Sequence, residues 1–196
     1  DMATLDRLVK KHNPLILTPL GNDTLIHNAI ESANVKTADW DDIIDLPNET
    51  RIHFEPCHHW GARGMRDRRM TLWSAFTIEG TSGKIHHIGD TGFHSGINFR
   101  KAKAKHKDFD LAILPIGAYA PRWFMKGQHM NPQEAVEGFK LLNAKAAIGH
   151  HWGTFQLTDE PIEEPVEFLE AALKDAKIPH EQFIASRPGQ VWTKTA

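Results

Sequence analysis

Histidine and aspartate side chains stand directly after three short segments that we predict to be β-strands. They are His59 after segment 51–57, Asp90 after segment 84–88, and His151 after segment 146–148. In α/β proteins, binding and catalytic groups gather beyond the carboxyl ends of strands, so these side chains can converge. Imidazole and carboxylate groups suit Zn²⁺, Mn²⁺ or iron. The pattern predicts one shared metal site, although Gly-Asp-Thr-Gly at 89–92 is also compatible with an ordinary turn.

An arginine cluster follows His59 closely, at positions 63, 66, 68 and 69. Guanidinium groups beside a cationic metal favour an anionic substrate, and phosphate is the best match to their planar fork. We therefore expect Arg63 and the Arg66–Arg69 stretch to border the cleft that contains His59. The alternative is a solvated loop paired with the acidic segment 39–45.

A third feature is an aromatic segment, Gly117 to Met125, followed by His129. It begins where an apolar strand ends and carries Arg122 among aromatic residues. Such a segment can form the apolar wall of a substrate pocket. Buried aromatic residues are also ordinary core components, so this alternative stays open. We expect the remaining histidines, among them His86, His87 and His106, to be surface residues or satisfied core residues.

Apolar spacing and turn residues predict the elements that position these groups. The expected helices are 4–12, 24–32, 97–106, 132–143 and 162–177, and the expected strands are 15–18, 51–57, 72–78, 84–88, 111–114, 146–148 and 190–193. The acidic segment 39–45 is predicted to be a solvated turn. Helices and strands alternate at both ends of the chain and a hairpin lies in the middle, which indicates an α/β fold with a mixed sheet. The 196 residues fit one domain, 1–196.

Composition excludes several classes of protein. The net charge of −2 gives no general attraction to nucleic acid. The single cysteine, Cys57, cannot form an internal disulfide. No apolar run reaches the roughly 18–20 residues of a membrane span, and no signal peptide is visible. We therefore expect a cytoplasmic protein without a transmembrane segment.

Five blocks of residues, in order along the whole chain, resemble one known family. They are Pro56-x-His-His-Trp60-x-x-Arg63; Gly89-Asp-Thr-Gly92; Asp110-Leu-Ala112 with Pro115-Ile-Gly-Ala-Tyr119 and Pro121-Arg-Trp-Phe-Met125; His129 with Asn131-Pro132 and Glu134-Ala135; and His151-Trp-Gly-Thr-Phe155 with Leu157 and Glu160. Together they are similar to the N-acylphosphatidylethanolamine-hydrolysing phospholipase D branch of the metallo-β-lactamase superfamily.

The resemblance implies an αββα sandwich and a dinuclear zinc hydrolase of phosphodiesters such as phospholipids. By this correspondence His59 binds the first metal, Asp90 bridges both metals and takes part in catalysis, and His151 binds the second metal. His129 lies over the site near the scissile phosphate as a catalytic residue. The expected substrate-binding residues are Arg63, Tyr119, Arg122 and Trp123. The neighbouring His58 and His150 do not align with ligands.

Two departures from the family pattern bear on activity. The superfamily motif His-x-His-x-Asp-His is absent from the sequence, and Ala120 stands where lipid-hydrolysing members usually carry Glu. The chain thus looks like an N-terminally truncated, C-terminal part of the fold that lacks part of the metal-ligand set. We expect zinc binding by this chain to be weak or absent and the chain alone to be inactive. The alternatives are a lactonase acting on a sugar phosphate, and a non-catalytic half-domain that forms a homodimer or pairs with a missing N-terminal half.

Overall fold

The computed structural model describes residues 1–64 and 66–193. Its elements, in chain order, are α1 (Met2–His12), β1 (Leu15–Pro19), α2 (Asn22–Ala29), β2 (Asn34–Ala38), β3 (Ile43–Asp45), β4 (Arg51–Glu55), β5 (Ala75–Gly80), β6 (Gly83–His87), the 3₁₀ helix η1 (His94–Gly96), α3 (Ile97–His106), β7 (Phe109–Pro115), α4 (Arg122–Met125), α5 (Pro132–Leu142), β8 (Ala144–His150), α6 (Glu164–Ala176), η2 (His180–Gln182) and β9 (Phe183–Ile184).

The main sheet has a mixed topology that gathers strand ends at one edge. Within the described residues it contains seven strands in the order β3-β4-β5-β6-β7-β8-β9. Neighbours are antiparallel from β3 to β6 and parallel from β6 to β9. Strand β4 therefore runs in the same direction as β6, β7 and β8. The carboxyl ends of these four strands lie at a common edge.

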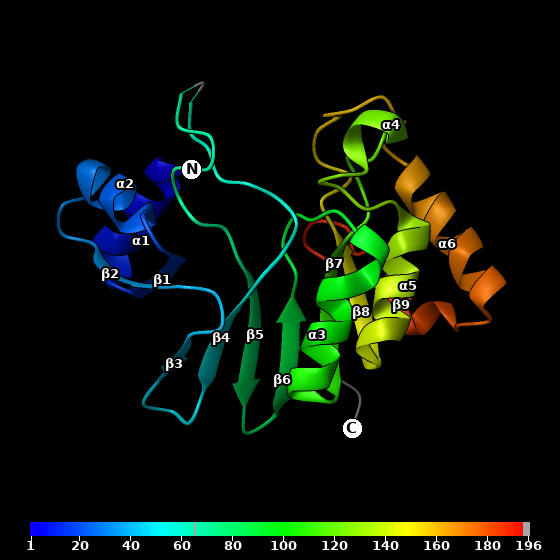
Figure 1. The fold of residues 1–196 in the computed structure, drawn as a ribbon, viewed down its shortest axis with the longest axis horizontal. Coiled ribbons are helices and arrows are strands. Elements are labelled where there is room, and N and C mark those ends of the chain that lie inside the picture. The colour runs from blue at the N-terminus through cyan, green and yellow to red at the C-terminus, as the bar shows by residue number, and fades with distance from the viewer. Residues whose placement is uncertain (65, 194–196) are drawn as a thin grey trace.

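Helices α3, α5 and α6 cover one face of this sheet (Figure 1). The strand residues that point toward them are fully buried, as Thr77, His86, Ala112 and Ala147 illustrate. These residues are paired in register across β5, β6, β7 and β8, so they lie on one face. The main hydrophobic core occupies the space between this face and the helices. Its members include the helix residues Phe99, Phe139, Leu142 and Leu169.

The opposite face of the sheet is apolar, and the described residues cover it only at its β3–β4 end. There Ile44, Ile52 and Phe54 form a second core with Ala38 of β2 and with Leu17 of β1. Farther along this face Leu111 of β7 is buried, whereas six other apolar side chains are at least partly exposed. They are Phe76, Ile78, Ile85, Ile113, Ile148 and Ile184. We call these six residues the open face.

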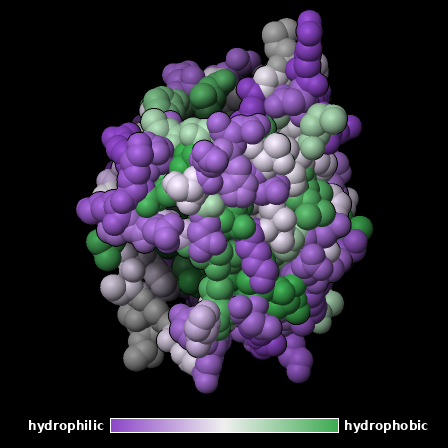
Figure 2. Space-filling view, turned by 90° about the vertical axis from the view of Figure 1, so that its left-hand side faces the viewer, coloured by the Kyte–Doolittle hydropathy of each residue, from purple (hydrophilic) through white to green (hydrophobic). Residues whose placement is uncertain are grey.

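The N-terminal lobe comprises α1, β1, α2 and β2. Strands β1 and β2 pair in parallel and α2 connects them, which is a βαβ unit. A small core of Val9, Ile26, Ile30 and Ala33 holds the lobe together. Figure 2 views the molecule from the side of this lobe and shows a stripe of hydrophobic residues bordered by hydrophilic ones.

The predicted α/β class, with a mixed sheet and flanking helices, is confirmed, but three local predictions are wrong. Segment 39–45 is not only a solvated turn: Ile43–Asp45 forms β3, because Ile44 packs into the second core. Strand β5 begins at Ala75 rather than at residue 72, since the Trp73 indole instead donates to the Cys57 carbonyl. Residues 190–193 do not form a strand. The backbone N–H of Gln190 donates to the Arg187 carbonyl in a turn, and the last strand is β9.

No helix among the described residues combines the length and the apolar composition that a membrane span needs.

Candidate metal centre

Three histidine side chains surround the carboxylate of Asp90 at the common edge of the sheet. His59 Nε2 lies 3.3 Å and His151 Nε2 lies 3.2 Å from Asp90 Oδ2. His129 Nδ1 lies 2.9 Å from the other oxygen, Oδ1. Ligand atoms of His59, Asp90 and His129 all lie within 4.8 Å of one another, which is a spacing that can hold a metal ion. The predicted convergence of His59, Asp90 and His151 is therefore confirmed, and His129 joins them.

The direction of the strands explains why these side chains meet. His59 follows β4, Asp90 follows β6 and His151 directly follows β8, and these three strands end at the same edge. Backbone contacts fix the first two loops to each other. The His58 N–H donates to Thr91 Oγ1 at 2.8 Å, and the Gly92 N–H donates to the His58 carbonyl at 2.9 Å.

The imidazole of His59 is oriented by its own loop. Its Nδ1 lies 2.9 Å from the Trp60 carbonyl oxygen. A carbonyl can only accept, so Nδ1 carries a proton, and Nε2 is the ring nitrogen that faces Asp90. Metal-binding histidines typically have this arrangement, in which one ring nitrogen donates to a carbonyl and the other faces the ion.

Arg122 fixes the segment that carries His129. Its guanidinium donates to the His129 carbonyl at 3.0 Å and to Glu134 Oε2 at 2.8 Å. Glu134 also closes a capping box with Asn131 at the start of α5. The predicted substrate-binding residue Arg122 thus has its charge paired within the protein, and its position makes it a support for His129.

His151 sits in a sharp turn immediately after β8. Its φ of 64° lies in the left-handed region, which is costly for a residue with a side chain. The neighbouring loop makes room for this turn at Gly117, where a Cβ atom would collide with the His151 carbonyl oxygen. Only glycine permits this close approach.

The electrostatics of the centre favour an ionised carboxylate. Burial alone would raise the pKa of Asp90, but its contacts with His129 and His151 outweigh burial and hold this pKa well below its usual range. Reciprocally, the contact with Asp90 raises the pKa of His151. Asp90 Oδ1 and His129 Nδ1 are buried, and despite their proximity neither has a well-aligned hydrogen bond. Buried polar atoms without such partners, together with three imidazoles and one carboxylate, fit a site for Zn²⁺ or a similar divalent ion.

The other predicted substrate-binding residues lie in three different places. Arg63 lines a pocket with residues of α1 and α2 in the N-terminal lobe. Arg68 of the arginine cluster places its guanidinium 4.3 Å from the Trp60 ring, which in turn stacks on His59. The Tyr119 hydroxyl donates to Glu164 of α6 in a partly buried contact. Trp123 is 79% exposed on α4.

His58 and His150, which we did not expect to bind a metal, contribute to packing next to the centre. The His58 ring stacks on His94 and contacts the Asn98 amide. His150 is buried, and burial lowers its pKa to about 3, so it is neutral.

Sequence reasoning missed a second group of buried polar residues: His53, Glu55 and His106. His106 was expected to be an ordinary helix or turn residue. The signal in the sequence was the spacing of His53 and Glu55, because alternate residues of a strand share one face.

Comparisons with known proteins agree with this arrangement. A family model described as "Beta-lactamase superfamily domain" matches residues 2–152. The N-acyl-phosphatidylethanolamine-hydrolyzing phospholipase D 1 of Caenorhabditis elegans is 43% identical over 140 residues, which cover 70% of this chain and 39% of the relative. The mitochondrial enzyme of the same name from Saccharomyces cerevisiae is 33% identical over 175 residues, covering 87% of this chain and 37% of the relative. The chain thus spans about two fifths of the length of these relatives.

Solved structures share the fold. The metallo-beta-lactamase fold protein YhfI from Bacillus subtilis superimposes with a TM-score of 0.67 and 17% identity, covering 98% of this chain and 72% of that protein. The metallo hydrolase Igni18 from Ignicoccus hospitalis superimposes with a TM-score of 0.66 and 16% identity, covering 94% and 70% respectively.

The close approach at Gly117 can be tested by substitution. We expect Gly117→Ala to destabilise the protein by about 1–3 kcal/mol, because the added methyl group displaces the His151 turn. Gly127→Ala is the matched control, since a Cβ atom there meets open space. Urea unfolding gives both free energies. Equal stability of the two variants would contradict the proposed packing.

Proposed function

Because this chain belongs to the β-lactamase superfamily, in the branch of the N-acylphosphatidylethanolamine-hydrolysing phospholipases D, we propose that it serves the metal-dependent hydrolysis of a phosphodiester in a phospholipid-like substrate. The observation that carries this proposal is the convergence of His59, His129 and His151 on Asp90 at the strand edge. We propose Zn²⁺ as the ion, since imidazole and carboxylate donors suit it.

Each residue of the centre has a defined part in the proposed reaction. Asp90, His59 and His151 would hold the ion, which when bound supplies Lewis-acid activation of water and of the phosphoryl oxygens. His129 presents Nδ1 to Asp90 and thereby leaves Nε2 to give a proton to the leaving alcohol. Arg122 keeps His129 in place through its backbone carbonyl.

Exposed apolar residues beside the centre favour a lipid substrate. Trp123 and Phe124 of α4 are 79% and 70% exposed, and Phe155 and Leu157 in the loop after His151 are comparably open to solvent. The two segments adjoin, because Glu160 accepts hydrogen bonds from the backbone of Tyr119 and Ala120. A patch of large apolar side chains typically marks a membrane or ligand contact. We call these four residues the apolar rim.

The metal centre is tested by charge removal. The test uses a protein in which a half that bears the His-x-His-x-Asp-His motif precedes this chain. With N-acylphosphatidylethanolamine vesicles and Zn²⁺, we expect Asp90→Asn to lower its phosphatidate release at least 100-fold, because the substitution removes the charge that holds the ion. Asp108→Asn, at an exposed loop position, is the control and should keep full turnover. Turnover of this joined protein that is equal with and without Asp90→Asn would contradict the proposal.

The apolar rim is tested by comparing two substrates. In the same joined protein, the double variant Trp123→Ser/Phe124→Ser should lose at least tenfold in turnover of vesicles and little in turnover of a water-soluble phosphodiester. Val191→Ser, which removes another highly exposed apolar side chain, is the matched control. Loss of the same size on both substrates would oppose a lipid-docking role for the rim. Preferential turnover of a soluble sugar-phosphate lactone would favour the lactonase alternative.

We further propose that the open face pairs two copies of the chain. The partly exposed Phe76, Ile85, Ile113 and Ile148 point away from α3, α5 and α6 on this face. Burying such apolar surface is favourable by roughly 25 cal/mol per Å², and a twofold dimer is the simplest way to bury it.

Light scattering at micromolar concentration should therefore give twice the mass of one chain. Ile113→Glu should yield monomers, because it places a charge in the middle of the contact. Ile162→Glu, at an exposed apolar position outside the open face, should remain dimeric. A monomer of the unmodified chain would contradict the pairing. A folded dimer without metal-dependent turnover would favour the non-catalytic half-domain.

A further inference from the structure

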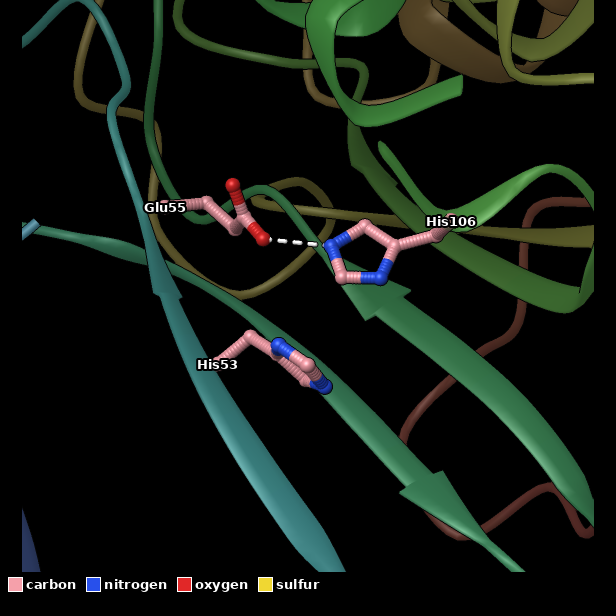
Figure 3. A group of neighbouring side chains, drawn as sticks. All are labelled: His53, Glu55 and His106. Atoms are coloured by element: carbon pink, nitrogen blue, oxygen red, sulfur yellow. Dashed lines mark hydrogen bonds and ion pairs between the residues drawn. The ribbon is translucent and has the colours of Figure 1, made fainter. Parts of the chain in front are cut away.

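A second group of convergent side chains lies between the sheet and α3. His53 and Glu55 are alternate residues of β4, and His106 is the last residue of α3. Figure 3 shows the carboxylate of Glu55 and both imidazoles turned toward one another. All three residues are about 4% exposed. They lie on the helix-covered face, together with Thr77 and His86.

The donor atoms of this group have the spacing of a metal site. One ligand atom from each residue lies within 4.8 Å of the other two. Glu55 Oε1 and His106 Nε2 are 2.5 Å apart, and the two imidazole rings have centroids 4.6 Å apart. Tetrahedral zinc bonds require donors about 3.3 Å apart.

We propose that His53, Glu55 and His106 form a second, buried site for a divalent transition-metal ion of the zinc class, separate from the centre at Asp90. The independent observation is His53 Nδ1, a buried nitrogen without a hydrogen-bond partner. The other nitrogen of this ring, Nε2, pairs with Glu79 Oε2 at 3.2 Å. A carboxylate on one nitrogen and a vacant second nitrogen match the typical environment of a metal-binding histidine.

The protonation states of the group suit a cation. Burial and the proximity of His106 lower the pKa of His53, so its ring is neutral. Burial would raise the pKa of Glu55, but its contacts with His106 and Lys105 outweigh burial and lower it, so the carboxylate is ionised. Neutral imidazole and ionised carboxylate are the forms that bind metal.

A simple buried ion pair is the competing explanation. Lys105 Nζ lies 3.4 Å from Glu55 Oε1, and it also lies 3.1 Å from Asp41 Oδ1. An ion pair among Glu55, His106 and Lys105 accounts for the carboxylate, but it leaves His53 Nδ1 unsatisfied. A metal ion satisfies all three ligands, and Lys105 retains Asp41 as its partner. The site would join β4 to α3, which are 51 residues apart in sequence at Glu55 and His106.

The test uses Zn²⁺ and Co²⁺ as probes on the full chain with the Asp90 centre disabled by Asp90→Asn and His59→Gln. We expect one Zn²⁺ per chain by isothermal titration calorimetry and visible absorption bands of tetrahedral Co²⁺. Adding His53→Gln should weaken binding at least tenfold. His86→Gln is the matched control, because His86 is equally buried on the same face but lies outside the group.

Lys105→Met separates the two explanations. Removal of the competing ammonium should tighten Zn²⁺ binding severalfold if the group holds a metal. Absence of stoichiometric Zn²⁺ binding in the Asp90→Asn/His59→Gln background would overturn the proposal, as would unchanged binding in His53→Gln. If His53→Gln fails to fold, the Co²⁺ bands of the background protein and their response to Lys105→Met decide the question.

Discussion

A buried carboxylate at the edge of the sheet is the constraint on which the site depends. Burial of Asp90 would be costly without compensation, because a lone charge loses its hydration. The three imidazoles around it supply that compensation, and each comes from a different loop. The loops must therefore be held within hydrogen-bond distance of one point. The contacts of Thr91, Gly92, Trp60 and Arg122 serve this purpose.

The strand order makes this arrangement possible at long range. Reversal of direction at β5 leaves β4 parallel to β6, so a hairpin strand and the parallel strands end at the same edge. As a result, His59, Asp90 and His151, which are far apart in the sequence, come together at this edge. The two faces of the sheet differ in their surroundings. Helices and the buried His53, Glu55 and His106 lie on one face, and the other face remains partly open.

Much of the fold and the position of the centre could be predicted from the sequence. The strand ends before His59, Asp90 and His151 were recognisable because proline, glycine or histidine residues follow each of the three β-rich runs. The position of Arg63 could not be predicted in this way, because the chain turns toward α1 between His59 and Arg63. Strand β3 was missed because burial of Ile44, a tertiary effect, outweighs the acidic composition of its neighbours. The pairing of His106 with Glu55 depends on where α3 crosses the sheet, which no local pattern encodes.

Short strands at both sheet edges have a consequence for the solubility of the protein. Within the described residues, β3 has three residues and β9 has two. An edge this short offers few free backbone groups to an incoming strand, so edge-to-edge growth into aggregates is disfavoured. The proposed contact through the open face, by contrast, is complete once two copies have met. The short edges thus disfavour open-ended growth of the sheet, even at the high local concentrations reached during synthesis.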